Sequence, residues 1–157
     1  MTENNQSRKS SPVAPLLRQW VRMPYGRNYT SKPYGLEFTV VSYNILAQDI
    51  LNVHPELYVD NDPVALNWPH RCERLVTEIH QLRPDILCLQ EVQQSHLWEL
   101  KAHFEDLNFD QHLYKQKNGS HGDGCAIFFN SELFELVDSH YVEYYQPNVE
   151  VCVPMAR

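Results

Sequence analysis

Residues 85–91 read DILCLQE, a short apolar run that is closed by one carboxylate, Glu91. A second apolar run, FTVVSY at residues 38–43, stops in a similar way on the amide Asn44. Runs of this length and composition predict buried strands. Because α/β folds place functional groups at strand ends, and carboxylate and amide oxygens suit a hard cation such as Mg²⁺, the two runs predict a divalent-metal site for phosphoryl chemistry.

Each of the two polar residues also has a simpler interpretation when it is judged alone. A glutamate at a strand end can cap the next helix or pair with a lysine, since an unpaired buried charge is costly. An asparagine commonly ends a strand and starts a turn. The metal interpretation therefore depends on the motifs that surround Asn44 and Glu91.

The order of apolar patterns predicts an α/β fold of layered sheets flanked by helices. Asn67 is expected to cap a helix that Pro84 ends, and Ser95 to cap a second helix. The remaining pattern gives the order β-α-β-α-β-β-β-β, with strands at 38–43, 85–90, 111–116, 124–129, 134–137 and 141–145. Residues 49–66 are expected to form a long loop with a helical turn at 55–58.

Composition sets limits on the class of protein. The 157 residues are 43% hydrophobic and 21% charged, which fits one domain with a real core. The net charge of −7 argues against a protein that coats nucleic acid, but it allows a nuclease that reaches the phosphate through metal ions. Without a membrane-length apolar run or a secretory leader, we expect a location in the cytoplasm, with the nucleus as an alternative.

The four cysteines are far apart and form no C-x-x-C pair: Cys72, Cys88, Cys125 and Cys152. Three of them lie in apolar stretches, so small buried side chains in a reducing compartment are favoured over zinc ligands or disulfides. The eight histidines are scattered, without an H-E-x-x-H motif, and are interpreted as surface or loop residues.

Four motifs appear in a characteristic order: SYNIL at 42–46, Trp68 with Arg71 at a helix start, LQEV at 89–92 and DGCAIF at 123–128. Together they resemble the endonuclease/exonuclease/phosphatase superfamily, whose fold is DNase I-like. The likeness covers residues 36–146 and is greatest for the branch of deadenylases, nocturnin and the angel proteins. The stretches YNILAQD at 43–49 and ALNW at 65–68 favour angel.

The resemblance implies a two-sheet α/β sandwich, of which this chain would hold the first half. We expect a disordered or extended lead-in over 1–35, a partial domain over 36–150 and a divergent or truncated tail over 151–157. The family's second half supplies further acidic ligands and a terminal Ser-Asp-His, and no Ser-Asp-His occurs here. The chain alone is therefore expected to be weakly active, and to leave an apolar sheet face for aggregation or for a protein partner.

Site residues follow from the same resemblance. It implies that Glu91 ligates Mg²⁺, with Mn²⁺ as an alternative, and that Asn44 helps to hold the metal and the phosphate; both are candidate catalytic residues and metal ligands. Candidate substrate contacts are Arg71, Lys115, Lys117 and Asp123. The alternatives are an exposed first-turn arginine, exposed edge-strand lysines and a hairpin-turn aspartate.

The implied activity is metal-dependent processing of RNA 3′ ends. The favoured form is a 3′–5′ exoribonuclease that shortens poly(A). The alternatives are a phosphatase for RNA 2′,3′-cyclic phosphates, a non-catalytic interaction isoform, and a phosphatase for nucleotides or phosphoinositides. The residues of this chain do not separate these activities.

Overall fold

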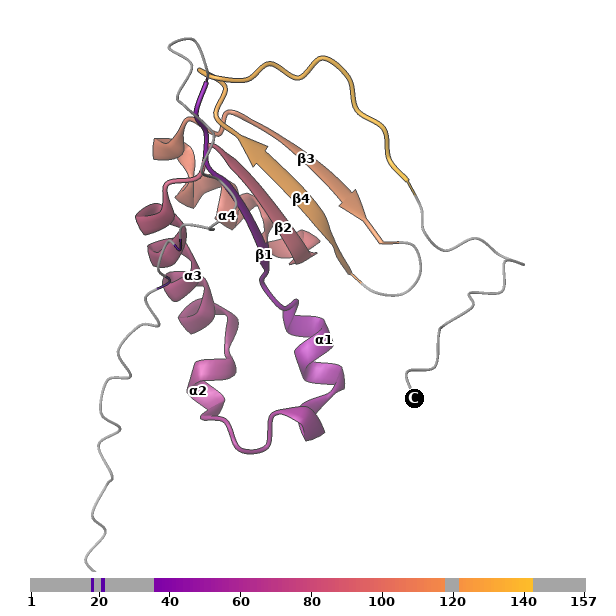
Figure 1. Cartoon of the computed structure of the whole chain (residues 1–157). Coiled ribbons are helices and arrows are strands. Elements are labelled where there is room, and N and C mark those ends of the chain that lie inside the picture. The colour runs from indigo at the N-terminus through magenta and orange to yellow at the C-terminus, as the bar shows by residue number, and fades with distance from the viewer. Residues whose placement is uncertain (1–17, 19–20, 22–35, 118–121, 143–157) are drawn as a thin grey trace, which may run out of the picture. The chain divides into compact units, whose positions relative to one another are not determined.

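The computed structural model describes residues 18, 21, 36–117 and 122–142. Their centre is a four-stranded sheet in the order β1-β2-β4-β3 (Figure 1). The strands are β1 Val40–Asn44, β2 Ile86–Gln93, β3 Gln111–Gln116 and β4 Asp123–Phe129. β1 and β2 are parallel, and the other two pairs are antiparallel. The strands predicted near 38–43, 85–90, 111–116 and 124–129 are thus confirmed, with shifted ends.

Helices fill the connection after β1, where a long loop was predicted. They are α1 Gln48–Val53, the 3₁₀ turn η1 Pro55–Leu57 and α2 Pro63–Leu66. The expected turn at 55–58 is present, but the prediction of a loop for the rest was wrong. Local capping explains α2, since the Asp62 carboxylate accepts a hydrogen bond from the Val64 N–H at 2.9 Å and Pro63 stands in the first turn.

The predicted helix between the first two strands is confirmed as α3, Trp68–Leu82. It ends on Arg83, whose backbone is left-handed with φ of 46°, directly before Pro84. The prediction that Ser95 caps the second helix was wrong. Ser95 lies inside the 3₁₀ turn η2 Gln94–His96, so α4 begins later and spans Leu97–His103, followed by η3 Glu105–Leu107.

The strand predicted at 134–137 was wrong. Residues 135–142 have no regular structure, and residues 143–145 of the last predicted strand lie outside the described part. A strand needs a neighbour that accepts its backbone hydrogen bonds, and the described residues offer none here: Leu136 and Val137 are exposed. The predictions for the lead-in and for the tail also fall largely outside the described residues.

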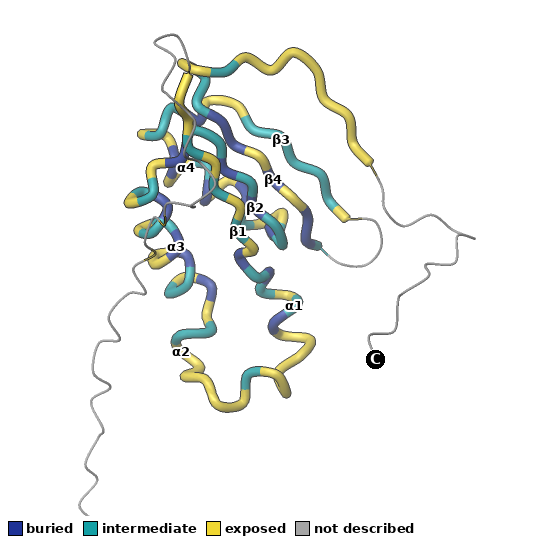
Figure 2. The backbone as a smooth tube through the Cα atoms, viewed as in Figure 1, coloured by how far each residue is buried: buried dark blue, intermediate teal, exposed yellow. Residues whose placement is uncertain are grey.

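The core lies between the sheet and the two longer helices, α3 and α4, which cover one face (Figure 2). Phe104 is fully buried, and its ring meets those of Phe109 and Phe128 at centroid distances of 6.3 and 5.7 Å. Trp68 is buried at the start of α3. Cys72 is buried too, and this burial raises the pKa of its thiol to about 11. Cys125 is exposed, so the prediction of buried cysteines does not hold for it.

The opposite face of the sheet carries apolar side chains, and no helix of the described residues covers it. Strand alternation puts Leu87 and Leu89 toward the helices and Ile86 and Cys88 away from them. On this open face Val40 is 51% exposed and Ile127 is 39% exposed. One sheet with one covered face is what half of a sandwich would present. Within the described residues, no helix has the length and apolar character needed to cross a membrane.

Replacing Phe104 by Ala should lower the free energy of unfolding by about 3–5 kcal/mol, because it leaves a cavity between three packed rings. Urea titration followed by circular dichroism measures the change. The matched control is Val64→Ala on α2, where the side chain is 61% exposed and the effect should stay within about 0.5 kcal/mol. Equal effects of the two substitutions would contradict this assignment of the core.

The open face should make the isolated chain self-associate unless a protein partner covers it. Sedimentation velocity over a concentration series should show oligomers for the 157-residue chain and fewer for the double variant Val40→Lys with Ile127→Lys. Val64→Lys, away from the sheet, is the control. A chain that remains monomeric across the series would remove the prediction.

Candidate active site

The structure brings Asn44 and Glu91 into direct contact, although 47 positions separate them. In the parallel register Asn44 lies beside Gln90, which places Glu91 next to the end of β1. The Asn44 Nδ2 donates a hydrogen bond to Glu91 Oε1 at 2.6 Å. The two side chains therefore lie in contact, through the amide nitrogen of Asn44 and one oxygen of Glu91. The meeting of both side chains' oxygens at one cation, and their catalytic and metal-binding roles, stay predictions.

A β-bulge in β2 gives Glu91 this position. Leu89 pairs with Ala126 and Val92 with Gly124, so β2 carries one extra residue against β4 between these pairs. Glu91 lies in the bulge with a left-handed backbone, φ of 56°. Such a φ is strained for a residue other than glycine, and strain of this kind is found at functional sites. The bulge keeps Leu89 and Val92 both in the core and leaves the carboxylate beside Asn44.

The second carboxylate oxygen of Glu91 is buried. No hydrogen-bond partner reaches Oε2 among the described residues, while Oε1 receives the Asn44 amide. A buried carboxylate oxygen without a donor is costly, and a bound cation would remove this cost. The residues present therefore fit a divalent cation that takes Glu91 Oε2 as a ligand.

Asn44 is held by bonds of its own. Its Oδ1 accepts the Leu46 N–H at 2.9 Å, in a turn where Leu46 has φ of 56°. With Nδ2 on Glu91 and Oδ1 on the backbone, Asn44 orients the carboxylate. Its expected second role as a metal ligand stays a prediction, since an amide oxygen has a second lone pair.

Arg71 clamps the turn that follows Asn44. Its NH1 group donates to the carbonyls of Ile45 and Leu46, at 2.8 Å each, and its NH2 group donates to Gln48 Oε1 at 2.9 Å. The guanidinium also lies 5.4 Å from the Trp68 ring centroid, and burial lowers the pKa of Arg71. The structure thus gives Arg71 a positioning role; its expected contact with substrate stays a prediction.

The other predicted substrate contacts lie at the same end of the sheet. Asp123 begins β4 opposite Gln93 and is 4% exposed. Its Oδ2 lies 3.5 Å from Lys117 Nζ, and its Oδ1 is buried without a hydrogen-bond partner in the described residues. Lys115 is on β3, where its Nζ donates to the Gln116 carbonyl at 2.9 Å. All six predicted residues thus belong to one region, with Arg71 behind the β1 turn.

Some residues of this region carried no sequence signal. Gln93 Oε1 accepts the Asp49 N–H at 3.2 Å, and the Gln94 N–H donates to the Gly122 carbonyl at 3.0 Å. These contacts join α1, the end of β2 and the start of β4. Gly124 is required by a close approach, because a Cβ there would lie 2.3 Å from the Lys115 carbonyl oxygen. The two glutamines belong to no motif, so only the fold identifies them.

Comparisons with known proteins give consistent matches. The profile of the Endonuclease/Exonuclease/phosphatase family matches residues 41–155. Protein angel homolog 1 of Rattus norvegicus is 42% identical over 116 residues, which are 73% of this chain and 17% of the relative.

Two solved structures also match. The crystal structure of ANGEL2, a 2′,3′-cyclic phosphatase, superposes with a TM-score of 0.67 at 38% identity, covering 71% of this chain and 32% of ANGEL2. Its complex with adenosine-2′,3′-vanadate gives the same TM-score, covering 72% and 33%. The α/β sheet described above is thus part of a DNase I-like fold. The chain spans about a sixth of the rat relative and a third of ANGEL2.

Replacing Glu91 tests the strain directly. Glu91→Gly should be more stable than Glu91→Ala by about 1–2 kcal/mol, because both remove the carboxylate and only glycine relieves the left-handed backbone. Parallel urea titrations of the two variants measure the difference. Equal stabilities, or a more stable alanine variant, would show that residue 91 is not strained.

Proposed function

The chain belongs to the endonuclease/exonuclease/phosphatase family, and on this premise we propose that it carries the Glu91 part of a divalent-metal phosphoesterase centre acting on RNA 3′ ends. One observation supports this most: Glu91 presents a buried oxygen without a donor in the described residues while Asn44 holds the other oxygen. The proposed cation is Mg²⁺, because the carboxylate and amide oxygens of Glu91 and Asn44 are hard ligands.

The chain's own residues have distinct parts in this proposal. A bound Mg²⁺ would polarise the phosphoryl group and offset charge on its oxygens. Glu91 Oε2 would hold the cation, and the Asn44 amide keeps the carboxylate in one orientation through Oε1. Arg71 fixes the turn that carries Asn44. Lys117 is 57% exposed beside Asp123 and adds positive charge where a phosphate would approach.

For the substrate we propose an RNA end with a 2′,3′-cyclic phosphate. The support is the likeness to ANGEL2, a 2′,3′-cyclic phosphatase that has also been crystallised with adenosine-2′,3′-vanadate. Shortening of poly(A), which the family resemblance favoured, stays a competing prediction. Because this chain spans only a third of ANGEL2, the activity is to be assayed in a protein that contains the whole family domain.

The activity test uses two RNA oligonucleotides that have the same sequence and both end in poly(A). One ends in a 2′,3′-cyclic phosphate and the other in a 3′-hydroxyl group. In the protein that contains this chain and the rest of the domain, Glu91→Gln should lower kcat/KM by about 10³-fold, since loss of metal-ion stabilisation costs several kcal/mol. Asn44→Ala should cost about 10–100-fold, as expected of a residue that orients a ligand. Chelation with EDTA should abolish turnover, and Mg²⁺ should restore it.

The matched control is Glu105→Gln, an exposed glutamate in η3 that should leave kcat/KM unchanged. Release of mononucleotides from the poly(A) substrate, with the cyclic phosphate intact, would replace the proposed substrate by the exonuclease alternative. Full activity of Glu91→Gln, or turnover that survives EDTA, would refute the metal role itself.

A further inference from the structure

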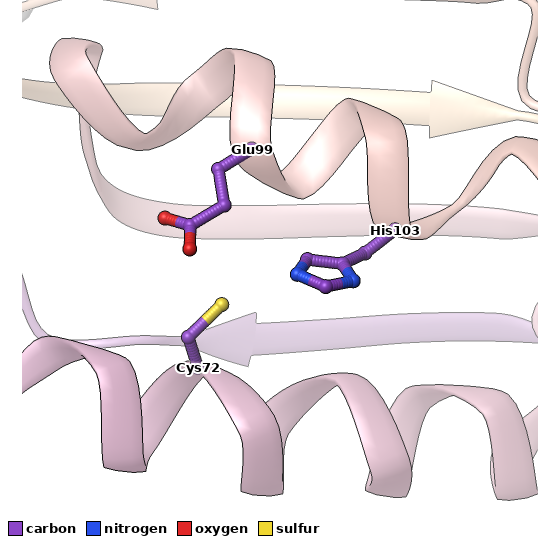
Figure 3. Close-up of side chains that lie close together, drawn as sticks. All are labelled: Cys72, Glu99 and His103. Carbon is purple, nitrogen blue, oxygen red and sulfur yellow. The ribbon is translucent and has the colours of Figure 1, made fainter.

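A second group of side chains that could hold a metal ion lies between α3 and α4. It consists of Cys72 on α3 with Glu99 and His103 on α4 (Figure 3). One ligand atom from each residue can be chosen so that all three atoms lie within 4.8 Å of one another. In Figure 3 the sulfur, the carboxylate and the imidazole face a common space between the two helices.

The arrangement follows from the helices. Glu99 and His103 are four residues apart on α4, so they project from the same face of that helix. Cys72 is 2% exposed and belongs to the packed face of α3. The three donors are a sulfur, a nitrogen and a carboxylate oxygen, which is a ligand set for Zn²⁺ and not for Mg²⁺.

We propose that this α3–α4 cluster is a binding site for a thiophilic divalent cation, Zn²⁺ by preference, held by Cys72 Sγ, the Glu99 carboxylate and a His103 ring nitrogen. A tetrahedral zinc with bonds of about 2.0–2.3 Å places its ligand atoms roughly 3.6 Å apart. The proposal requires the three ligand atoms, which lie within 4.8 Å of one another, to reach this spacing, and the exposed side chains of Glu99 and His103 are the ones that would rotate. A water molecule would complete the fourth position.

One neighbour already orients the carboxylate. The Trp68 indole Nε1–H donates a hydrogen bond to Glu99 Oε2 at 2.6 Å, which leaves Oε1 for a cation. A supporting hydrogen bond of this kind is a regular part of protein metal sites. When the metal binds, the Cys72 thiol loses its proton and the thiolate becomes the ligand.

The proposed zinc would join α3 to α4, the two helices that form the layer beneath the sheet. Trp68 connects it to the candidate active site, since the Arg71 guanidinium lies over the Trp68 ring and holds the turn after Asn44. The isolated position of Cys72 in the sequence, without a C-x-x-C partner, favours a plain buried thiol. The fold changes this interpretation, because it places Glu99 and His103 beside Cys72, and neither residue forms a short sequence motif with Cys72.

The test uses the full 157-residue chain, freed of metal. Titration with Co²⁺ should give one equivalent of binding and a near-ultraviolet charge-transfer band from the cobalt–thiolate bond, and Zn²⁺ should displace the Co²⁺. Calorimetry should show Zn²⁺ binding weakened at least about tenfold in Glu99→Gln and in His103→Gln. Cys72→Ser should lose the charge-transfer band. Because Cys72 is buried, the exposed His103→Gln keeps the test valid if Cys72→Ser fails to fold.

Matched controls separate this site from non-specific metal binding. Cys125→Ser removes an exposed thiol, and His54→Gln removes an exposed imidazole; both should bind Zn²⁺ like the parent chain. The proposal is overturned if no charge-transfer band appears, if His103→Gln and Glu99→Gln keep the parent affinity, or if the two controls weaken binding equally. Activity is not part of the readout, so failure here would leave the Glu91 proposal unaffected.

Discussion

The hydrogen bond from Asn44 Nδ2 to Glu91 Oε1 is the interaction on which the candidate site depends. It requires the parallel register of β1 with β2, which brings the two strand ends together, and the extra residue in β2, which gives Glu91 its left-handed backbone. The unfavourable backbone and the unpartnered Oε2 both have a cost in the free protein. A cation bound beside Oε2 would offset the cost of the unpartnered oxygen and would explain why the strained backbone at Glu91 is present.

Residues of the helices α3 and α4 stabilise the strand ends that carry Asn44 and Glu91. Arg71 on α3 is bonded to the two carbonyls that follow Asn44, and it is held in turn by contact with Trp68. The same indole donates to Glu99 on α4. Through these contacts the geometry at the strand ends depends on how α3 and α4 pack, which gives the proposed zinc a structural route to the candidate active site.

The sequence predicted those features that local pattern determines. The apolar runs and Pro84 predicted the four observed strands and α3, and the order of motifs predicted the family. The position of Asn44 and Glu91 at two strand ends predicted that they belong to one site. It failed where tertiary contacts decide. Helix α1 follows the turn that Arg71 clamps from α3, and the two apolar positions Leu136 and Val137 find no strand to pair with among the described residues. The bulge at Glu91 appears only once β4 lies beside β2. The local cap of α2, Asp62 before Pro63, was a signal that the sequence did contain and that the loop prediction missed. Clusters such as Cys72 with Glu99 and His103 join distant positions, so spacing rules do not detect them.

The most direct test of the central claim is to locate a cation at Glu91. Crystals of the family domain that contains this chain, grown with Mn²⁺ as a substitute for Mg²⁺, would be measured for anomalous scattering. If Glu91 is a metal ligand, a peak should appear within coordination distance of its Oε2, with Asn44 still donating to Oε1 and with no peak in a Glu91→Gln crystal. A lysine or arginine side chain bonded to Oε2 in place of the metal, with manganese found elsewhere, would contradict it.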